Sequence, residues 1–331
     1  MVSINPRRLE DTNAYSAGAT LTWDLPRDRY VQQILLWMYL DDVDQAVAAG
    51  DQTDYPKVFD SVRIVLNGNI TLVSAEGEDL FQLATREYKE QPYVSASAAV
   101  ADAQALYCMI PIPFMLEVDN PYDFSALIPA QGASSFQLFV VCGDLNALDS
   151  NTTVNSGTFY VEMKEVNMTT AESDARYGKN LESLARIQIS QKIHTITSTT
   201  TNYSGRIDVP TGNYVRKILL RTKDSSAVES DVEFDTYRFF FNPGQQQLYQ
   251  NEWVLSRAED KLEHQIDFAE LWSGYVLYDP EQLMGNEKFR GSLNLTGMKN
   301  GDLQLQYNTG TGGADGFVVM TSKVYNFPTN L

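Results

Sequence analysis

The chain has 331 residues, of which 43% are hydrophobic, 21% charged and 11% aromatic, and this composition excludes a disordered chain. Its formal net charge of −18 would repel a phosphate backbone, which argues against direct binding to nucleic acid. The length suits two domains of ordinary size.

The first half of the chain predicts a series of short strands. They are apolar or alternating segments rich in Val, Ile, Phe, Tyr and Thr. The segments are Thr20–Leu25, Val31–Leu40, Ser61–Leu66, Ile70–Ser74, Leu106–Ile112, Phe136–Cys142 and Thr158–Val166. Asn67 and Gly68 form a type I′ hairpin signal, because both turn positions need a positive φ. A helix is predicted after it, since Leu80, Leu83 and Ala84 are spaced as one helical face.

The second half predicts the same kinds of element. Its expected strands are Arg186–Thr195, Ser204–Val209, Val215–Thr222, Thr236–Phe241, Tyr275–Tyr278, Gly291–Leu295, Leu303–Tyr307 and Phe317–Tyr325. Asn242 begins a turn, and a helix is expected behind Trp253, with Leu255, Ala258 and Leu262 as its apolar face. Such a count of strands in each half is typical of a β-sandwich or jelly roll.

A polar segment, 169–185, separates the halves and is expected to be the linker between them. Thr169 and Glu172 have the spacing of a helix capping box. The expected domains are therefore 1–168 and 186–331.

The two halves also share sequence. Asp24, Pro26 and Tyr30 return at a shift of 184 residues (24 to 208), and seven of 13 aligned columns are identical there. Two further blocks return in the same order at shifts of 175 (60 to 235) and 159 (167 to 326). The first-half members are Asp24, Pro26, Tyr30, Asp60, Arg63, Asn67 and Asn167, and their partners are Asp208, Pro210, Tyr214, Asp235, Arg238, Asn242 and Asn326. Two tandem copies of one domain fit this pattern.

The repeated charges have a structural interpretation. An Asp-apolar-Pro bend before a long core strand shapes the entry of the chain in both copies. Asp60 with Arg63, and Asp235 with Arg238, could form ionic contacts at a strand start. A duplicated active site would need further catalytic residue types at matching positions.

Few residues point to metal or redox chemistry. The chain has two histidines, His194 and His264, too few for a cupin-type metal site. Asp41, Asp42 and Asp44 are a weak candidate for a structural calcium ion, without the spacing of an EF-hand; a solvated acidic loop is the alternative, and no cofactor is expected. Cys108 and Cys142 lie in apolar runs and are expected to be buried thiols, with a bond between them as the alternative.

No apolar stretch is long enough to span a bilayer, and no signal-peptide core opens the chain, so synthesis in the cytoplasm is expected. Arg7 and Arg8 are the sole basic cluster, which could meet an anionic lipid head group, an acidic subunit, or solvent.

Two tandem sandwiches, each with a short helix after a turn, resemble the double jelly-roll major capsid proteins of icosahedral viruses with an internal membrane. The stretch from Ser61 to Gly68, followed by Asp79 to Leu83, is similar in particular to the corticovirus coat protein. Adenovirus hexon and tectivirus coat proteins have a similar architecture. The resemblance implies an all-β fold of two eight-stranded jelly-roll barrels.

The same resemblance implies a function and partners. Proteins of this family form homotrimers that pack as pseudo-hexagonal tiles with neighbouring capsomers and penton or minor capsid proteins in the virion. It also implies that Arg7 and Arg8 lie toward the internal viral membrane. The alternative from the residues is a two-domain protein that binds or cleaves glycans, in which Trp253, Trp272 and Tyr275 would stack on sugar rings.

Overall fold

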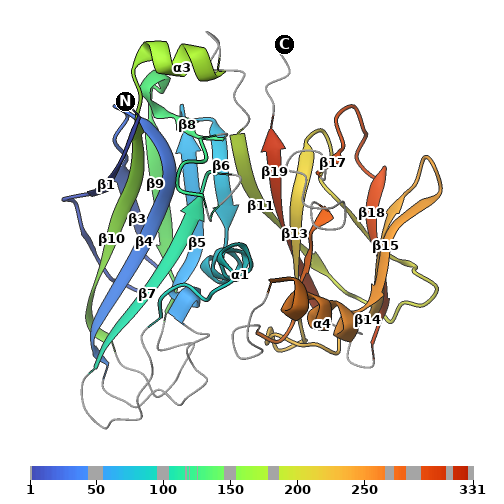
Figure 1. Cartoon of the computed structure of the whole chain (residues 1–331). Coiled ribbons are helices and arrows are strands. Elements are labelled where there is room, and N and C mark those ends of the chain that lie inside the picture. The colour runs from blue at the N-terminus through green and yellow to red at the C-terminus, as the bar shows by residue number, and fades with distance from the viewer. Residues whose placement is uncertain are drawn as a thin grey trace. The chain divides into compact units, whose positions relative to one another are not determined.

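A computed structural model describes residues 2–43, 55–94, 104–115, 118, 120–124, 126–144, 154–177, 186–264, 272–280, 292–310 and 316–326. The chain divides into two compact units. Unit 1 comprises Met1–Ile187 with Phe327–Leu331, and unit 2 comprises Gln188–Asn326. Each unit contains two sheets of four main strands that face each other, with one helix after the fifth long strand (Figure 1).

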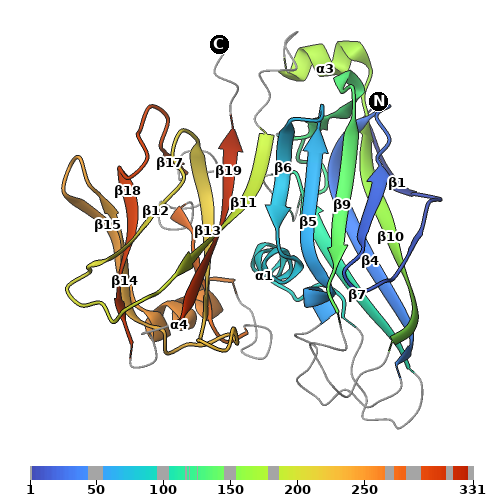
Figure 2. The same cartoon turned by 180° about the vertical axis from the view of Figure 1, so that it is seen from behind.

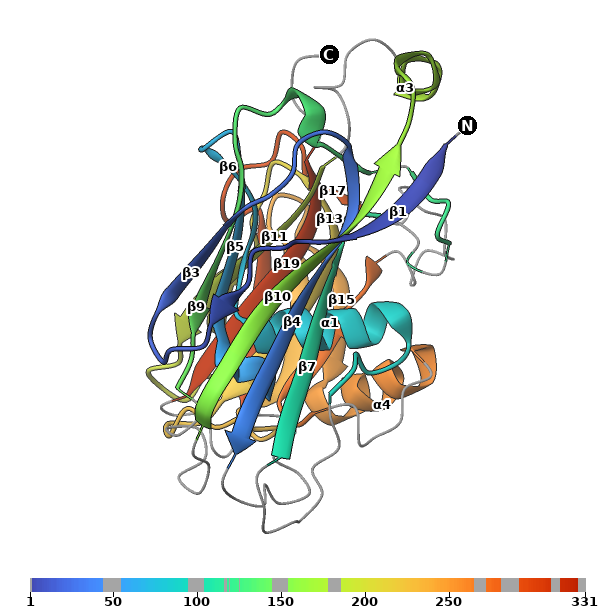
Figure 3. The ribbon, with the colours of Figure 1, turned by 90° about the vertical axis from the view of Figure 1, so that its left-hand side faces the viewer.

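Unit 1 is built from ten described strands. They are β1 (Ser3–Arg8), β2 (Asn13–Ala14), β3 (Thr20–Asp24), β4 (Tyr30–Val43), β5 (Phe59–Leu66), β6 (Ile70–Ala75), β7 (Gln104–Pro113), β8 (Ile128–Pro129), β9 (Phe136–Cys142) and β10 (Val154–Asn167). One sheet has the order β1-β10-β4-β7, with β2 and β8 beside it, and is seen in Figure 3. The other has the order β6-β5-β9-β3 and is seen in Figure 2. The helices are α1 (Gly77–Tyr88) and α3 (Thr170–Tyr177), with short 3-10 turns at Tyr55–Val58 and Ala130–Gly132.

Unit 2 repeats this plan. Its strands are β11 (Arg186–Thr195), β12 (Gly205–Asp208), β13 (Tyr214–Lys223), β14 (Phe234–Phe241), β15 (Gln246–Glu252), β16 (Tyr275–Tyr278), β17 (Leu293–Asn294), β18 (Leu303–Thr309) and β19 (Phe317–Asn326). Its sheets have the orders β11-β19-β13-β16, with β17 beside β13, and β12-β18-β14-β15. The helix α4 (Trp253–His264) stands where α1 stands in unit 1. Strand order and helix position thus confirm two jelly rolls in tandem.

The residues that are buried at alternate positions along the strands form the core of each unit. In β4, Ile34, Leu36 and Met38 are at most 2% exposed and face β10 residues of the same kind, such as Phe159. Phe59 of β5 meets Phe159 edge-on with ring centroids 5.3 Å apart, which joins the two sheets of unit 1. An equivalent core in unit 2 contains Ile218, Leu220, Phe239 and Met320 among its members.

Several local expectations are confirmed. Asn67 and Gly68 have φ of 56° and 74°, as a type I′ turn requires. Glu172 accepts a hydrogen bond from the Thr169 amide, and the Thr169 hydroxyl accepts one from the Glu172 amide, so the capping box forms at α3. The expected linker 169–185 therefore begins with a helix, and residues 178–185 lie outside the described part of the chain.

One expectation about packing is wrong. Leu255 and Leu262 of α4 were expected to face the core, but they are 51% and 78% exposed. The face of α4 that packs inward carries Trp253, Ser256, Asp260 and His264. It is held by side-chain hydrogen bonds: Tyr237 Oη donates to Ser256 Oγ, and the Leu277 amide donates to Asp260 Oδ2. These bonds hold the helix with its leucines facing outward, although its apolar pattern predicted that they face the core.

Candidate functional sites

The repeated aspartates occupy equivalent places in the two barrels. Asp24 ends β3 and accepts a hydrogen bond from Gln137 Nε2 on β9 at 2.9 Å. Asp208 ends β12 and accepts one from Gln304 Nε2 on β18 at 3.0 Å. In both barrels the apolar residue after the aspartate donates its backbone amide to the neighbouring strand. Leu25 N donates to Phe136 O at 2.8 Å, and Val209 N donates to Leu303 O at 3.0 Å.

The remaining repeat residues follow the same plan. Pro26 and Pro210 lie just after these bends, and Tyr30 and Tyr214 are the first residues of β4 and β13. Asn67 and Asn242 begin the turns after β5 and β14. Asn167 and Asn326 are the last residues of β10 and β19. These residues therefore mark matching points of the two jelly rolls and are not gathered in one site.

The two repeated arginines contact aromatic rings. Arg63 lies over the ring of Phe139 at 4.7 Å. Arg238 lies over Tyr203 at 4.2 Å and donates to Gln306 Oε1 at 2.9 Å. Asp60 and Asp235 are exposed at the starts of β5 and β14. The expected ionic contacts within these pairs are not among the interactions of these described residues, because stacking across the strands takes the guanidinium groups instead.

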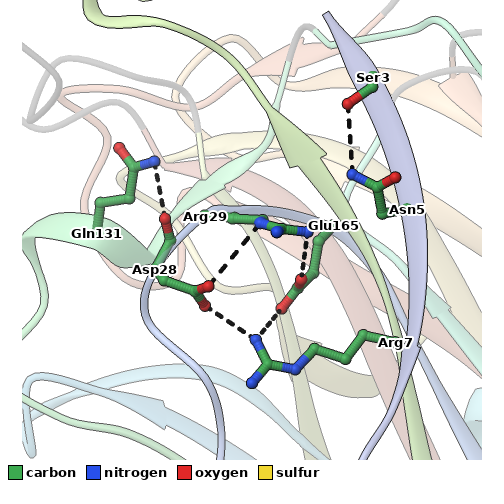
Figure 4. A network of polar contacts seen from close by, with 7 residues as sticks. All are labelled: Ser3, Asn5, Arg7, Asp28, Arg29, Gln131 and Glu165. Carbon is green, nitrogen blue, oxygen red and sulfur yellow. Dashed lines mark hydrogen bonds and ion pairs between the residues drawn. The ribbon is translucent and has the colours of Figure 1, made fainter.

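Arg7 belongs to a charged network at one end of unit 1 (Figure 4). Its Nη1 lies 3.1 Å from Asp28 Oδ1 and 3.5 Å from Glu165 Oε1. Arg29 Nη1 lies 3.4 Å from the other Glu165 oxygen, and Gln131 Nε2 donates to the Asp28 carbonyl oxygen. The Glu165 side chain is only 1% exposed. The network ties the N-terminal strand β1 and the loop before β4 to β10.

Opposing effects act on the pKa of the Glu165 carboxyl, and burial is the largest of them. Desolvation raises its pKa and Asp28 raises it further, while Arg7 and Arg29 lower it, and the balance lies above the ordinary value. The two arginines neutralise this buried carboxylate without removing the cost of burying it.

Arg8 has a different environment. Its guanidinium lies over the ring of Tyr160 at 4.3 Å. It stands at one side of an open groove of about 420 Å³ on the outer face of the β1-β10-β4-β7 sheet. The other principal lining residues are Trp37, Tyr39, Tyr107, Tyr160 and Glu162.

Sequence analysis did not single out this groove. Its signal is the unbroken apolar run from Ile34 to Leu40, in which every second residue from Ile34 points inward and Leu35, Trp37 and Tyr39 lie on the opposite face. A strand that is apolar on both faces is covered on both faces or binds something.

The remaining candidates do not form a site in the described part of the chain. Asp41 and Asp42 belong to β4 and Asp44 follows it, but their side chains lie outside the described residues. No group of three His, Cys, Asp or Glu suited to a metal occurs among the residues that are described. His194 on β11 lies beside Tyr307, whereas His264 is buried at the end of α4.

Burial decides two further expectations. Cys108 and Cys142 are free and buried, so the expectation of unbonded thiols is confirmed. Trp253, Trp272 and Tyr275 are 1%, 7% and 1% exposed, so they are packed in the chain and do not offer rings to a sugar. The described helices include none long and apolar enough to cross a membrane.

Solved structures resemble this chain over nearly its whole length. The crystal structure of the STIV MCP has a TM-score of 0.78 at 16% identity and covers 98% of this chain and 97% of that chain. The atomic structure of Sulfolobus Turreted Icosahedral Virus contains a chain with a TM-score of 0.81 at 16% identity, covering 98% and 91%. The major capsid protein P2 from bacteriophage PM2 has a TM-score of 0.63 at 13% identity, covering 100% and 99%. No protein-family model and no curated protein matches by sequence. The chain therefore has the double jelly-roll fold of these coat proteins.

Proposed function

We propose that this chain is the major capsid (coat) protein of an icosahedral virus and that it forms homotrimers that tile the shell. The observation that carries the proposal is the match of both barrels with major capsid proteins, which covers at least 97% of each chain compared. The role is structural rather than enzymatic, and its partners are further copies of the chain, neighbouring capsomers, and penton or minor capsid proteins.

The duplication supports this role physically. Two linked barrels with the same strand order give each trimer six similar bodies, which approximate the hexagonal tile of a closed shell. The residues that repeat between the barrels are strand ends and turns, which build each barrel. A duplicated catalytic site would instead repeat side chains around a pocket.

The proposal includes an internal membrane beneath the shell, toward which Arg7 and Arg8 point their exposed atoms. Both residues are exposed, and each is held by a contact, Arg7 by Asp28 and Arg8 by Tyr160. Flotation with vesicles containing anionic lipid tests this part: the assembled wild-type protein should float, and R7A/R8A should float less. Equal flotation of both would remove the arginines from the membrane contact.

Size-exclusion chromatography with light scattering, followed by electron microscopy of concentrated samples, tests the main proposal. We expect a mass of three chains in solution and sheets or shells on concentration. A protein that stays monomeric at every concentration and salt condition tested would contradict the assignment.

A further inference from the structure

The helix α4 carries an apolar stripe on its outer side. Val254, Leu255 and Leu262 are 68%, 51% and 78% exposed, and Ala258 between them is also exposed. Helical spacing puts these residues on the face opposite Trp253, with Lys261 along one edge and Glu259 along the other. Because single exposed apolar residues are common but a continuous helical stripe is not, the stripe indicates a contact surface.

The groove of unit 1 is a second exposed apolar surface, and it is of a different kind. Trp37, Tyr39, Tyr107 and Tyr160 line it with rings, and Arg8 and Glu162, opposite each other on β1 and β10, border it. Tyr39 and Tyr107 contact each other with ring centroids 4.9 Å apart. The groove has a volume of about 420 Å³ and is lined by aromatic rings, so it can receive the leucine side chains of a helix.

The repeat shows that each surface has a counterpart that the chain buries. The helix of unit 1, α1, is buried along its whole run from Gly77 to Glu87. The sheet face of unit 2 that matches the groove is buried as well: Leu219, Arg221 and Thr321, which align with Leu35, Trp37 and Glu162, are each 0% exposed. Among the described residues, the helix is therefore exposed on its outer side in the second copy, and the matching sheet face is partly exposed in the first copy.

We propose that the α4 stripe of one chain docks into the groove of a second copy of the same chain, so that the contact between copies joins one helix to one sheet face. This inference rests on the proposed function and names the surfaces of its trimer. The two surfaces are unlike, so the contact is heterologous, and a heterologous contact closes into a ring when the rotation between copies allows it. Charge supports a second copy as the occupant, since Lys261 at the edge of the stripe can meet Glu162 at the groove.

Substitutions on the stripe give the first test. Leu255→Glu with Leu262→Glu places two carboxylates on an exposed helix face, which leaves the fold unchanged and weakens docking. Since the variant loses the apolar burial of two leucines, the dissociation constant should rise about a hundredfold or more. Val232→Glu, an equally exposed apolar position elsewhere in unit 2, is the matched control and should keep the wild-type mass. Circular dichroism and thermal melting verify that each variant is folded.

Paired cysteines give the second test, which does not depend on destabilising the contact. A chain carrying both Leu262→Cys and Tyr107→Cys should form covalent dimers and trimers on mild oxidation, whereas each single variant should stay uncrosslinked. The native thiols Cys108 and Cys142 are buried and should not take part.

The outcomes separate the two proposals. If the double glutamate variant forms trimers as readily as the wild type, or if the paired cysteines do not crosslink within a trimer, the trimer contact uses other surfaces and the coat-protein assignment still stands. Crosslinking by a single cysteine variant would also overturn the inference, because it requires like surfaces to meet. A wild-type protein that never associates would overturn both.

Discussion

Asp24 and Asp208 make the same bond at the same point of the two barrels, although 184 residues separate them. Each carboxylate holds a glutamine on the adjacent strand where the chain leaves one sheet for the other. The repetition of a residue and of its partner indicates a constraint of the barrel itself and not of any ligand.

Asp24→Ala and Asp208→Ala should therefore cost similar amounts, about 0.5–1.5 kcal/mol each, which is the usual net value of one hydrogen bond. Denaturant unfolding of the two variants measures this cost. Asp235→Ala, at an exposed position of β14, is the control and should change stability by less. Losses that differ severalfold between Asp24 and Asp208 would contradict their equivalence.

Glu165 is a buried carboxyl whose charge state depends on the fold of unit 1. Burial raises its pKa above the ordinary carboxyl value in spite of Arg7 and Arg29. The folded protein consequently binds this proton more tightly than the unfolded chain. Its contribution to stability is complete below the ordinary carboxyl pKa and is lost as pH rises through the raised one.

Glu165→Gln removes this titration while keeping the side-chain shape. We expect the melting temperature of the wild type, relative to E165Q, to fall as pH rises through the window between the ordinary and the raised pKa. Melting curves at closely spaced pH values measure the difference, and Glu10→Gln, at an exposed position, is the control. A difference that does not vary with pH would show that Glu165 keeps an ordinary pKa.

At the scale of elements, α4 shows how partners override an amphipathic pattern. The periodicity of Leu255, Ala258 and Leu262 predicted the helix correctly but assigned its buried face wrongly. Trp253 decides the orientation, because its ring enters the core against Phe234 and its Nε1 donates to Asp231. The leucines are then left for a surface that a single chain does not supply.

Trp253→Ala should cost about 3–5 kcal/mol, as expected for a buried tryptophan. Leu262→Ala, nine residues along the same helix, should change the stability of the isolated chain by less than about 0.5 kcal/mol. Denaturant unfolding at concentrations below association compares them. A large loss from Leu262→Ala at those concentrations would mean that this side chain packs within its own chain.

The strands β1 and β15 were not predicted from the sequence, for a common reason. β1 and β15 lie at sheet edges and carry mostly polar residues, as in the segment Gln246–Glu252, where no residue is buried. An edge strand is held by backbone hydrogen bonds on one side and needs no apolar face. Periodicity detects burial and therefore does not detect strands of this kind.

At the scale of the whole molecule, the net charge of −18 opposes any association of identical chains. Three chains would bring these charges together, so the attraction has to come from apolar surfaces such as the α4 stripe and the groove. Salt screens the long-range repulsion more than it weakens apolar contacts.

Association should therefore strengthen as ionic strength rises from about 0.01 M to about 0.15 M, over which the screening length falls from about 30 Å to about 8 Å. Sedimentation velocity at a fixed protein concentration measures the trimer fraction across this range. Weaker association at the higher salt would mean that charge pairs, and not apolar burial, dominate the contact.

The duplication, the all-β class, the type I′ turn at Asn67 and the helices α1 and α4 could be predicted from the residues alone, because each depends on local geometry or on residues repeated in order. The sequence also indicated the coat-protein architecture that the structural comparisons support. Three features required the folded arrangement: α4 turns its leucines outward, Arg63 and Arg238 stack on rings, and Trp37, Tyr39, Tyr107 and Tyr160 meet in one groove. These features depend on which distant strands lie beside one another, and spacing along a single strand or helix carries no information about its neighbours.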